Sequence, residues 1–112
     1  MQFTKDTSKV LASIYKIYLD RRKDGQSKEE AIRFNEDFYK DVKVLSTWLN
    51  SDISSAIHEL SDAKFIKPNI IGGFRIENTL IIQMENRFKS GASEVAKYIM
   101  DLIANTASGL VF

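Results

Sequence analysis

The chain has 112 residues, 44% hydrophobic and 28% charged, a composition typical of one globular domain with a single core. Sixteen Lys and Arg residues against fifteen Asp and Glu residues leave a formal charge of +1, so no overall charge favours nucleic acid or an anionic membrane. Without cysteine, disulfides and thiolate metal sites are excluded, and with no apolar run of signal-peptide or membrane-span type we expect a cytoplasmic protein without a membrane association.

Two helices are predicted in the first third of the chain. Apolar residues spaced three and four apart indicate a helix over 4–23, which Gly25 ends. The cations of its basic end, Arg21–Lys23, interact favourably with the helix dipole and can serve as a solvated cap. A phosphate contact is the alternative role for them. Ser27 and Glu30 have the spacing of a capping box and start a second helix. The short apolar face of that helix consists of Ala31, Ile32 and Phe34.

The next segment lacks a clear period. Residues 35–41 predict a loop that holds Phe38 or Tyr39 against the core. Residues 42–45, VKVL, fit a strand or a short helix, because so short a run does not distinguish the two periods. Trp48 precedes the next helix, and we expect it to be a core anchor under that helix rather than a platform for a base.

A helix followed by a β-hairpin is predicted at the centre of the chain. Residues 50–52, Asn-Ser-Asp, are all N-cap types and predict the start of the helix. From Phe65 the chain becomes extended, and Gly72-Gly73 gives the signal of a two-residue hairpin turn before Phe74. The apolar face of the helix consists of Ile53, Ala56, Ile57 and Leu60.

Two further helices are predicted after the hairpin. Residues 78–89 fit a strand at first, but Met84–Lys89 has poor strand character, so a helix capped by Asn78 or Thr79 is favoured. Residues 92–106 predict a last helix, followed by an apolar tail over 109–112 that can dock on another surface.

These segments resemble winged-helix proteins. Asp52–Leu60, DISSAIHEL, followed by Ala63–Ile66, AKFI, is similar to their recognition helix and the strand after it, although Lys64 stands where glycine is common. Ser27–Phe34, Trp48 with its spacing to Leu60, and Met84–Lys89 more specifically resemble the small YjcQ-like proteins of Gram-positive bacteria and their phages. The resemblance implies one winged helix-turn-helix domain over 1–112, mainly α with a small β-hairpin. Its core spans about 4–89, and the extra C-terminal helix and tail span 92–112.

No enzyme is expected from these residues. His58 and Asp62 lie four apart, a spacing more typical of a solvated pair than of a catalytic dyad. The chain contains no phosphate loop, nucleophile elbow or set of metal ligands. We therefore predict no cofactor, no metal and no small-molecule substrate.

The first functional hypothesis is binding of double-stranded DNA, implied by the winged-helix resemblance, in a transcriptional regulator of bacterial or prophage origin. The YjcQ-like group itself carries no established activity. Against this hypothesis, the central helix carries Asp52, Glu59 and Asp62 and no Lys or Arg, which repels phosphates. The candidate DNA contacts are Ser54, Ser55, His58 and Ser61 on the helix and Lys64, Lys67 and Arg75 at the hairpin.

The alternative hypothesis is a non-enzymatic protein–protein interaction module on the same scaffold. Its surface would be the last helix and the tail, which can pack on the first helix or can form a homodimer. The candidate dimer or partner surface consists of Val95, Ile99, Leu102, Ile103 and Phe112.

Overall fold

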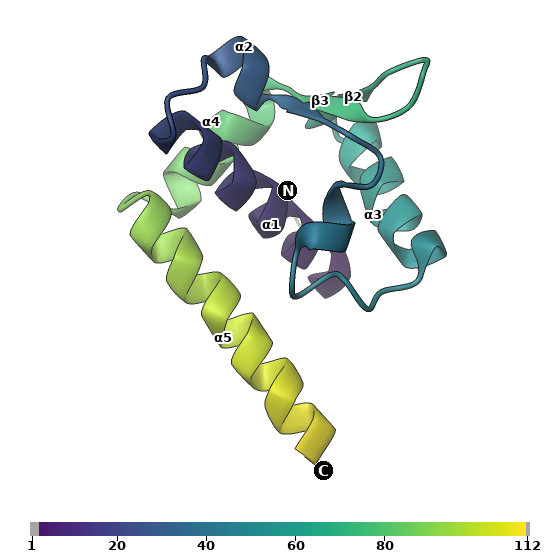
Figure 1. Ribbon diagram of the computed structural model, residues 1–112, viewed down its shortest axis with the longest axis vertical. Helices are drawn as coiled ribbons and strands as arrows, with labels where there is room; N and C mark the ends of the chain where they lie inside the picture. Colours follow the sequence, from purple (N-terminus) through teal and green to yellow (C-terminus); the bar gives the residue numbers. More distant parts are fainter. Residues whose placement is uncertain (1–2, 112) are drawn as a thin grey trace.

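The computed structural model describes residues 3–111, with side chains described for 3–101. The described chain is mainly helical and contains a small three-stranded antiparallel sheet with the order β1-β3-β2 (Figure 1). The elements are α1 (Lys5–Lys23), α2 (Lys28–Ala31), β1 (Arg33–Phe34), the 3-10 helix η1 (Phe38–Asp41), α3 (Asn50–Asp62), β2 (Ile66–Pro68), β3 (Phe74–Ile76), α4 (Asn78–Arg87) and α5 (Ala92–Val111).

Helix α1 is the central packing element. It runs between α3 and the first part of α5, and it contacts both (Figure 1). Thr4 is its N-cap and accepts a hydrogen bond from the backbone N–H of Thr7. At the other end Gly25 has a φ of +99°, a conformation that favours glycine after a helix. The predicted first helix is therefore confirmed, starting one residue later than expected.

The second helix is shorter than predicted, and the strand after it was missed. The capping box of Ser27 and Glu30 is present, and these hydrogen bonds lower the pKa of the Glu30 carboxyl. The prediction that Phe34 lies on the helix is wrong, because Arg33 and Phe34 form β1 and pair with β3. The Phe34 ring stacks on that of Phe74 at 5.1 Å, so burial of two aromatic rings favours the strand over a longer helix.

Residues 35–49 connect the sheet to α3 through η1 and a series of turns. Both Phe38 and Tyr39 are buried, so the predicted loop holds two aromatic side chains in the core rather than one. Residues 43–47 are turns and form neither of the two structures that VKVL suggested. Trp48 is only partly buried against the core, so it is a less enclosed anchor than we predicted.

Helix α3 begins differently from the prediction. Its N-cap is Leu49, and no side chain accepts a hydrogen bond there. Asn50 does not cap the helix because its Oδ1 accepts a hydrogen bond from the Tyr39 hydroxyl instead. The apolar face is buried as expected, except that Ile57 is only partly buried.

Helix α3 ends in a Schellman motif without glycine. The backbone N–H of Lys64 donates to the Ser61 carbonyl, and that of Phe65 donates to the Leu60 carbonyl, both at 3.0 Å. Lys64 itself has a φ of +66°, in the left-handed region that a side chain disfavours. The turn where the winged-helix resemblance lacked its glycine therefore forms with a strained lysine.

The hairpin turn is longer than predicted. The Asn69 N–H donates to the Gly73 carbonyl, so the loop spans residues 69–73 rather than two glycines. Gly73 has a φ of +74°, and a Cβ added there would lie 2.3 Å from the Phe34 carbonyl oxygen. This close approach lets β1 complete the sheet beside the hairpin.

The two helices after the hairpin cover the remaining core. Helix α4 confirms the helical prediction, but its N-cap is Glu77, because Asn78 accepts a hydrogen bond from Lys28 and Thr79 donates one to the Lys64 carbonyl. The backbone of α5 continues to Val111, beyond the predicted end at 106, and runs away from the rest of the chain (Figure 1). Within the described residues, every helix is too short or too polar to cross a membrane.

Candidate nucleic-acid interface

The exposed face of α3 is polar and carries no basic side chain. Ser54, Ser55 and His58 are exposed, as the DNA hypothesis requires, whereas Ser61 is partly buried. The three exposed residues lie beside acidic side chains in an open, shallow hollow. This hollow is lined by Ser51, Ser54, Ser55, His58, Glu59 and Asp62. The helix can offer hydroxyl and imidazole groups to base edges, but it offers phosphates no positive charge.

One of the three acidic residues on α3 has a structural partner. The Thr7 hydroxyl donates to Glu59 Oε2 at 2.7 Å, and this hydrogen bond joins α1 to α3. Asp52 and Asp62 remain exposed. The Thr7 hydroxyl brings no positive charge to Glu59, so all three carboxylates contribute to the repulsion that the sequence predicted, and Asp52 and Asp62 are the more exposed.

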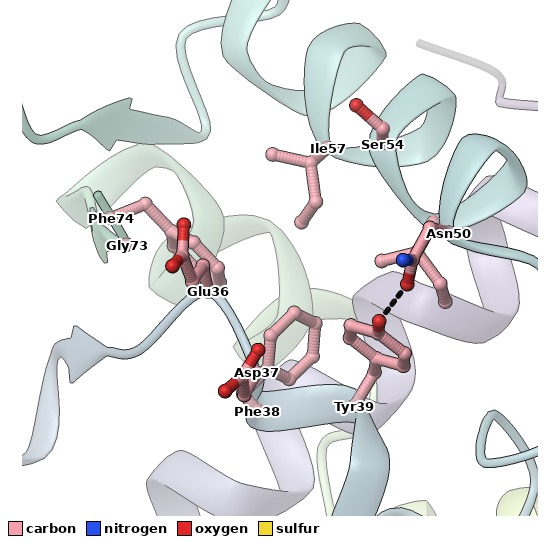
Figure 2. A pocket seen from close by; sticks show the side chains of 10 residues that line it. Glu36, Asp37, Phe38, Tyr39, Asn50, Ser54, Ile57, Gly73 and Phe74 are labelled. Atoms are coloured by element: carbon pink, nitrogen blue, oxygen red, sulfur yellow. Dashed lines mark hydrogen bonds between the residues drawn. The ribbon is translucent and has the colours of Figure 1, made fainter.

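A second hollow of about 420 Å³ lies between η1, α3 and the end of the hairpin (Figure 2). Its aromatic lining comes from Phe38, Tyr39 and Phe74, and Ser54 lines the same hollow from α3. Two carboxylates, Glu36 and Asp37, also lie there. Glu36 and Asp37 therefore add negative charge next to α3.

The outer face of the sheet has the opposite charge. In the antiparallel register Arg33 lies opposite Arg75, and Lys67 lies opposite Arg75 from the other side. All three side chains are exposed, while their neighbours along the strands, such as Phe34, Phe74 and Ile76, are buried. We call Arg33, Arg75 and Lys67 the basic row. Arg33 was missed in the sequence because residues 33–34 were assigned to a helix.

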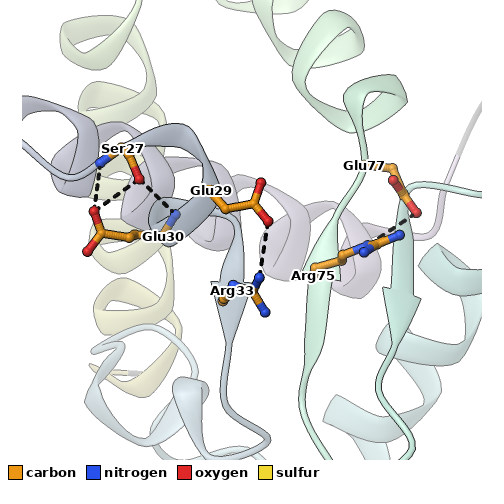
Figure 3. Close-up of polar contacts among 6 residues, drawn as sticks. All are labelled: Ser27, Glu29, Glu30, Arg33, Arg75 and Glu77. Carbon is orange, nitrogen blue, oxygen red and sulfur yellow. Dashed lines mark hydrogen bonds and ion pairs between the residues drawn. The ribbon is translucent and has the colours of Figure 1, made fainter.

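Two members of the basic row have acidic neighbours (Figure 3). Arg33 Nη2 lies 3.1 Å from Glu29 Oε1, and Arg75 Nε lies 3.9 Å from Glu77 Oε1. Both pairs are exposed to solvent, where such ion pairs contribute about 0–1 kcal/mol. They are therefore weak enough for a stronger anion to replace.

A third hollow, of about 500 Å³, adjoins the basic row at β2. It receives Ser61 and Lys64 from the end of α3, Lys67 from β2, and Asn78 and Thr79 from the start of α4. Lys28 reaches the same place from α2, since its Nζ donates to Asn78 Oδ1 at 2.7 Å. The fold thus gathers three basic side chains from three separate segments, Lys28, Lys64 and Lys67, next to the end of α3.

Arg21 stabilises the edge of the sheet. Its Nη1 donates to the carbonyl oxygens of Ala31 and Arg33, at 3.2 and 2.6 Å, and its guanidinium lies over the Phe34 ring. Partial burial lowers the pKa of this guanidinium. Arg21 therefore covers the open edge of β1. Its guanidinium is engaged there, so it is neither a solvated cap of α1 nor available to a phosphate.

The predicted partner surface on α5 divides into two parts. Val95 is fully buried in the core, so it packs within the chain and is not available to a partner. Ile99 and its neighbour Tyr98 are partly buried against the same core. The side chains of Leu102, Ile103 and Phe112 lie outside the described part of the chain.

No protein-family model, curated protein or solved structure matches this chain. Among the residues whose side chains are described, no group of three His, Cys, Asp or Glu residues is arranged to hold a metal ion.

Proposed function

We propose that the chain is a winged-helix protein that binds double-stranded DNA, in a non-enzymatic regulatory role. The observation that carries the proposal is the arrangement of α3, the hairpin and β1. Helix α3 passes through one tight turn into β2, the hairpin returns as β3, and β1 completes the sheet in the order β1-β3-β2. This is the arrangement expected of a recognition helix followed by its wing.

Exposure of the candidate residues supports separate roles for the helix and the hairpin. Lys67 and Arg75 project from the hairpin and would contact phosphates, whose charge is the same for every sequence. Ser54, Ser55 and His58 project from α3 and would contact base edges, which differ between sequences. Ser61 and Lys64 line the hollow between these two groups.

Fluorescence anisotropy of the full chain with a labelled random-sequence duplex tests the proposal. We expect binding at about 50 mM salt that weakens steeply as salt rises, because non-specific binding is electrostatic. Lys67→Ala and Arg75→Ala should weaken binding to all sequences alike. Replacing Ser54, Ser55 and His58 by alanine should reduce the preference for a selected site by about 1–3 kcal/mol per contact. Absence of binding at low salt would reject the proposal.

A second candidate function, a protein-interaction module, is favoured by the tip of the hairpin. Ile70 and Ile71 are 105% and 98% exposed, and adjacent exposed aliphatic side chains are typical of a contact surface. The α5 surface could in addition pair two copies. Sedimentation of the intact chain and of a chain truncated after Asn105 tests this pairing. A monomer in both cases would exclude pairing of two copies through α5.

A further inference from the structure

The basic row is costly to the free protein. Side chains directly opposite each other on antiparallel strands have Cβ atoms about 4.5–5.5 Å apart, and like charges at that separation are destabilising. Arg75 lies between two such neighbours, Arg33 and Lys67. Within the described part of the chain, Lys67 makes no ion pair. Three adjacent cations therefore lie on an exposed face, where two carboxylates, Glu29 and Glu77, offset part of their charge.

The surroundings enlarge this positive face. Lys28 and Lys64 adjoin it through the hollow at β2, and two carboxylates, Glu29 and Glu77, oppose it. Five basic side chains therefore lie on the sheet and its border with Glu29 and Glu77, and a third carboxylate, Glu36, lies beside the hairpin loop at Gly72. On α3 the exposed charged residues Asp52 and Asp62 are both negative. The near-zero total charge of the chain hides this separation of charge.

The chemistry of the row favours phosphates over a protein partner. Protein interfaces take most of their binding energy from a few anchors, enriched in Trp, Tyr and Arg, that lie in well-packed and desolvated pockets, whereas Lys is depleted there. The outward positions on the three strands hold Arg33, Arg75 and Lys67 without an aromatic anchor beside them, because Phe34 and Phe74 point into the core. Phosphate contacts need only Lys and Arg side chains, and they account for most non-specific affinity for duplex DNA.

We propose that the outer face of the sheet, rather than α3, is the principal phosphate-binding surface, and that Arg33, Arg75 and Lys67 contact phosphates of one DNA strand. This inference rests on the proposed function and assigns its electrostatic contacts. It adds Arg33, on a strand outside the hairpin, to the interface. Neighbouring strands are about 4.8 Å apart, so the row spans roughly 10 Å of the bound backbone.

Salt dependence provides the direct measurement. Each phosphate contact contributes about 0.9 to the slope of log K against log salt, so Arg33→Gln should reduce the magnitude of that slope by about this amount. Glu29→Gln should have the opposite effect on affinity, because it removes the carboxylate that competes for Arg33. Lys97→Gln is the matched control: Lys97 is exposed on α5, away from the sheet (Figure 1), and its loss should leave the slope unchanged.

Thermal melts of the same variants separate binding from folding. Arg33→Gln removes a like-charge contact with Arg75 and also the exposed ion pair with Glu29, which contributes little. The melting temperature of this variant should therefore equal or exceed that of the wild type. Weaker binding without loss of stability would support a role in phosphate contact. Weaker binding that accompanies a lower melting temperature would overturn that role in favour of a structural one.

The outcomes distinguish this inference from the proposed function. If the chain binds duplex and Arg33→Gln keeps the wild-type slope, the sheet assignment is wrong and DNA binding stands. If the wild type fails to bind duplex at low salt, both fall. If a poly-glutamate peptide binds the wild type as tightly as the duplex does and loses affinity on Arg33→Gln, the row recognises an acidic protein, which overturns the phosphate assignment.

Discussion

Helix α3 and the sheet are neighbours in the fold, but their exposed faces carry opposite charge. The exposed side of α3 presents serines, one histidine and two exposed carboxylates, Asp52 and Asp62. The exposed side of the sheet presents Arg33, Arg75 and Lys67 in one row. The winged-helix resemblance predicts DNA contacts on α3, whereas the distribution of charge favours phosphate contacts on the sheet.

The difference suggests how two roles can be separated: one element can read the bases while its neighbour supplies the affinity for phosphates. A helix with polar, uncharged side chains can read base edges, but it gains little from the phosphate lattice. A flat basic face gains that energy and is insensitive to sequence. If DNA is the partner, the sheet would hold the duplex and α3 would select the site. Four substitutions test this division, in order of decreasing effect.

Leu60→Ala should remove both surfaces by destabilising the scaffold that they share. Leu60 is fully buried on the inner side of α3, and its carbonyl accepts the hydrogen bond that closes the turn into β2. Loss of its side chain should cost about 2–5 kcal/mol in free energy of unfolding, measured by urea denaturation. Ile57→Ala, at a partly buried position on the same helix, should cost less. Equal losses at the two positions would contradict the observed orientation of α3.

Gly73→Ala should disrupt the sheet face while leaving α3 intact. The added Cβ would meet the Phe34 carbonyl oxygen at 2.3 Å, so β1 must move away from the hairpin. Backbone strain and overpacking together should cost roughly 2–5 kcal/mol. Gly25→Ala is the control, because Gly25 also has a positive φ but has no atom within 4 Å of an added Cβ. A stability loss no greater than that of the control would show that β1 is not held this closely.

Lys64→Gly should change stability and binding in opposite directions. Lys64 has a φ of +66°, so glycine there relieves strain, and part of that gain is offset by the entropy of the unfolded chain. We expect a net stabilisation of about 0.5–1 kcal/mol in thermal denaturation. The same change removes a cation beside the basic row and should weaken duplex binding. Lys64→Asn, which tolerates the left-handed conformation, should lose the charge with less gain in stability.

Asp62→Asn should give the smallest effect, on the α3 side of the comparison. Removal of one exposed carboxylate should strengthen duplex binding by up to about 1 kcal/mol at low salt, because it reduces repulsion of phosphates. Glu59→Ala is not equivalent, since Glu59 accepts a hydrogen bond from Thr7 and loss of that acceptor should also lower stability. Unchanged affinity for Asp62→Asn at low salt would mean that this end of α3 stays away from the duplex.

Local patterns in the sequence correctly predicted the elements whose cause is local. The period of apolar residues identified α1, α3 and α4, and the spacing of Ser27 and Glu30 identified the capping box. These features depend on residues three or four positions apart, so a single stretch of sequence contains their whole cause. For the same reason the exposed polar residues of α3, such as Ser54 and His58, could be named in advance.

Features that depend on distant contacts were misassigned. Caps were predicted among residues 50–52 and at Asn78 or Thr79, but the N-caps are Leu49 and Glu77. The side chains of Asn50 and Asn78 instead accept hydrogen bonds from Tyr39 and Lys28. Val95 was expected on a partner surface, but the packing of α5 on α1 buries it. In each case a group from another element competes successfully with the local interaction.

The mainly helical content, the hairpin after α3 and the acidic character of α3 follow from local residue patterns. The strand at residues 33–34 depends on tertiary contacts instead, because this two-residue segment is stabilised by stacking on Phe74 and by the close approach at Gly73. That strand brings Arg33 beside Arg75, 42 positions later in the chain (75 − 33), with Lys67 on the other side. The basic row exists through strand register alone, and register is set by long-range pairing that no local pattern of residues contains.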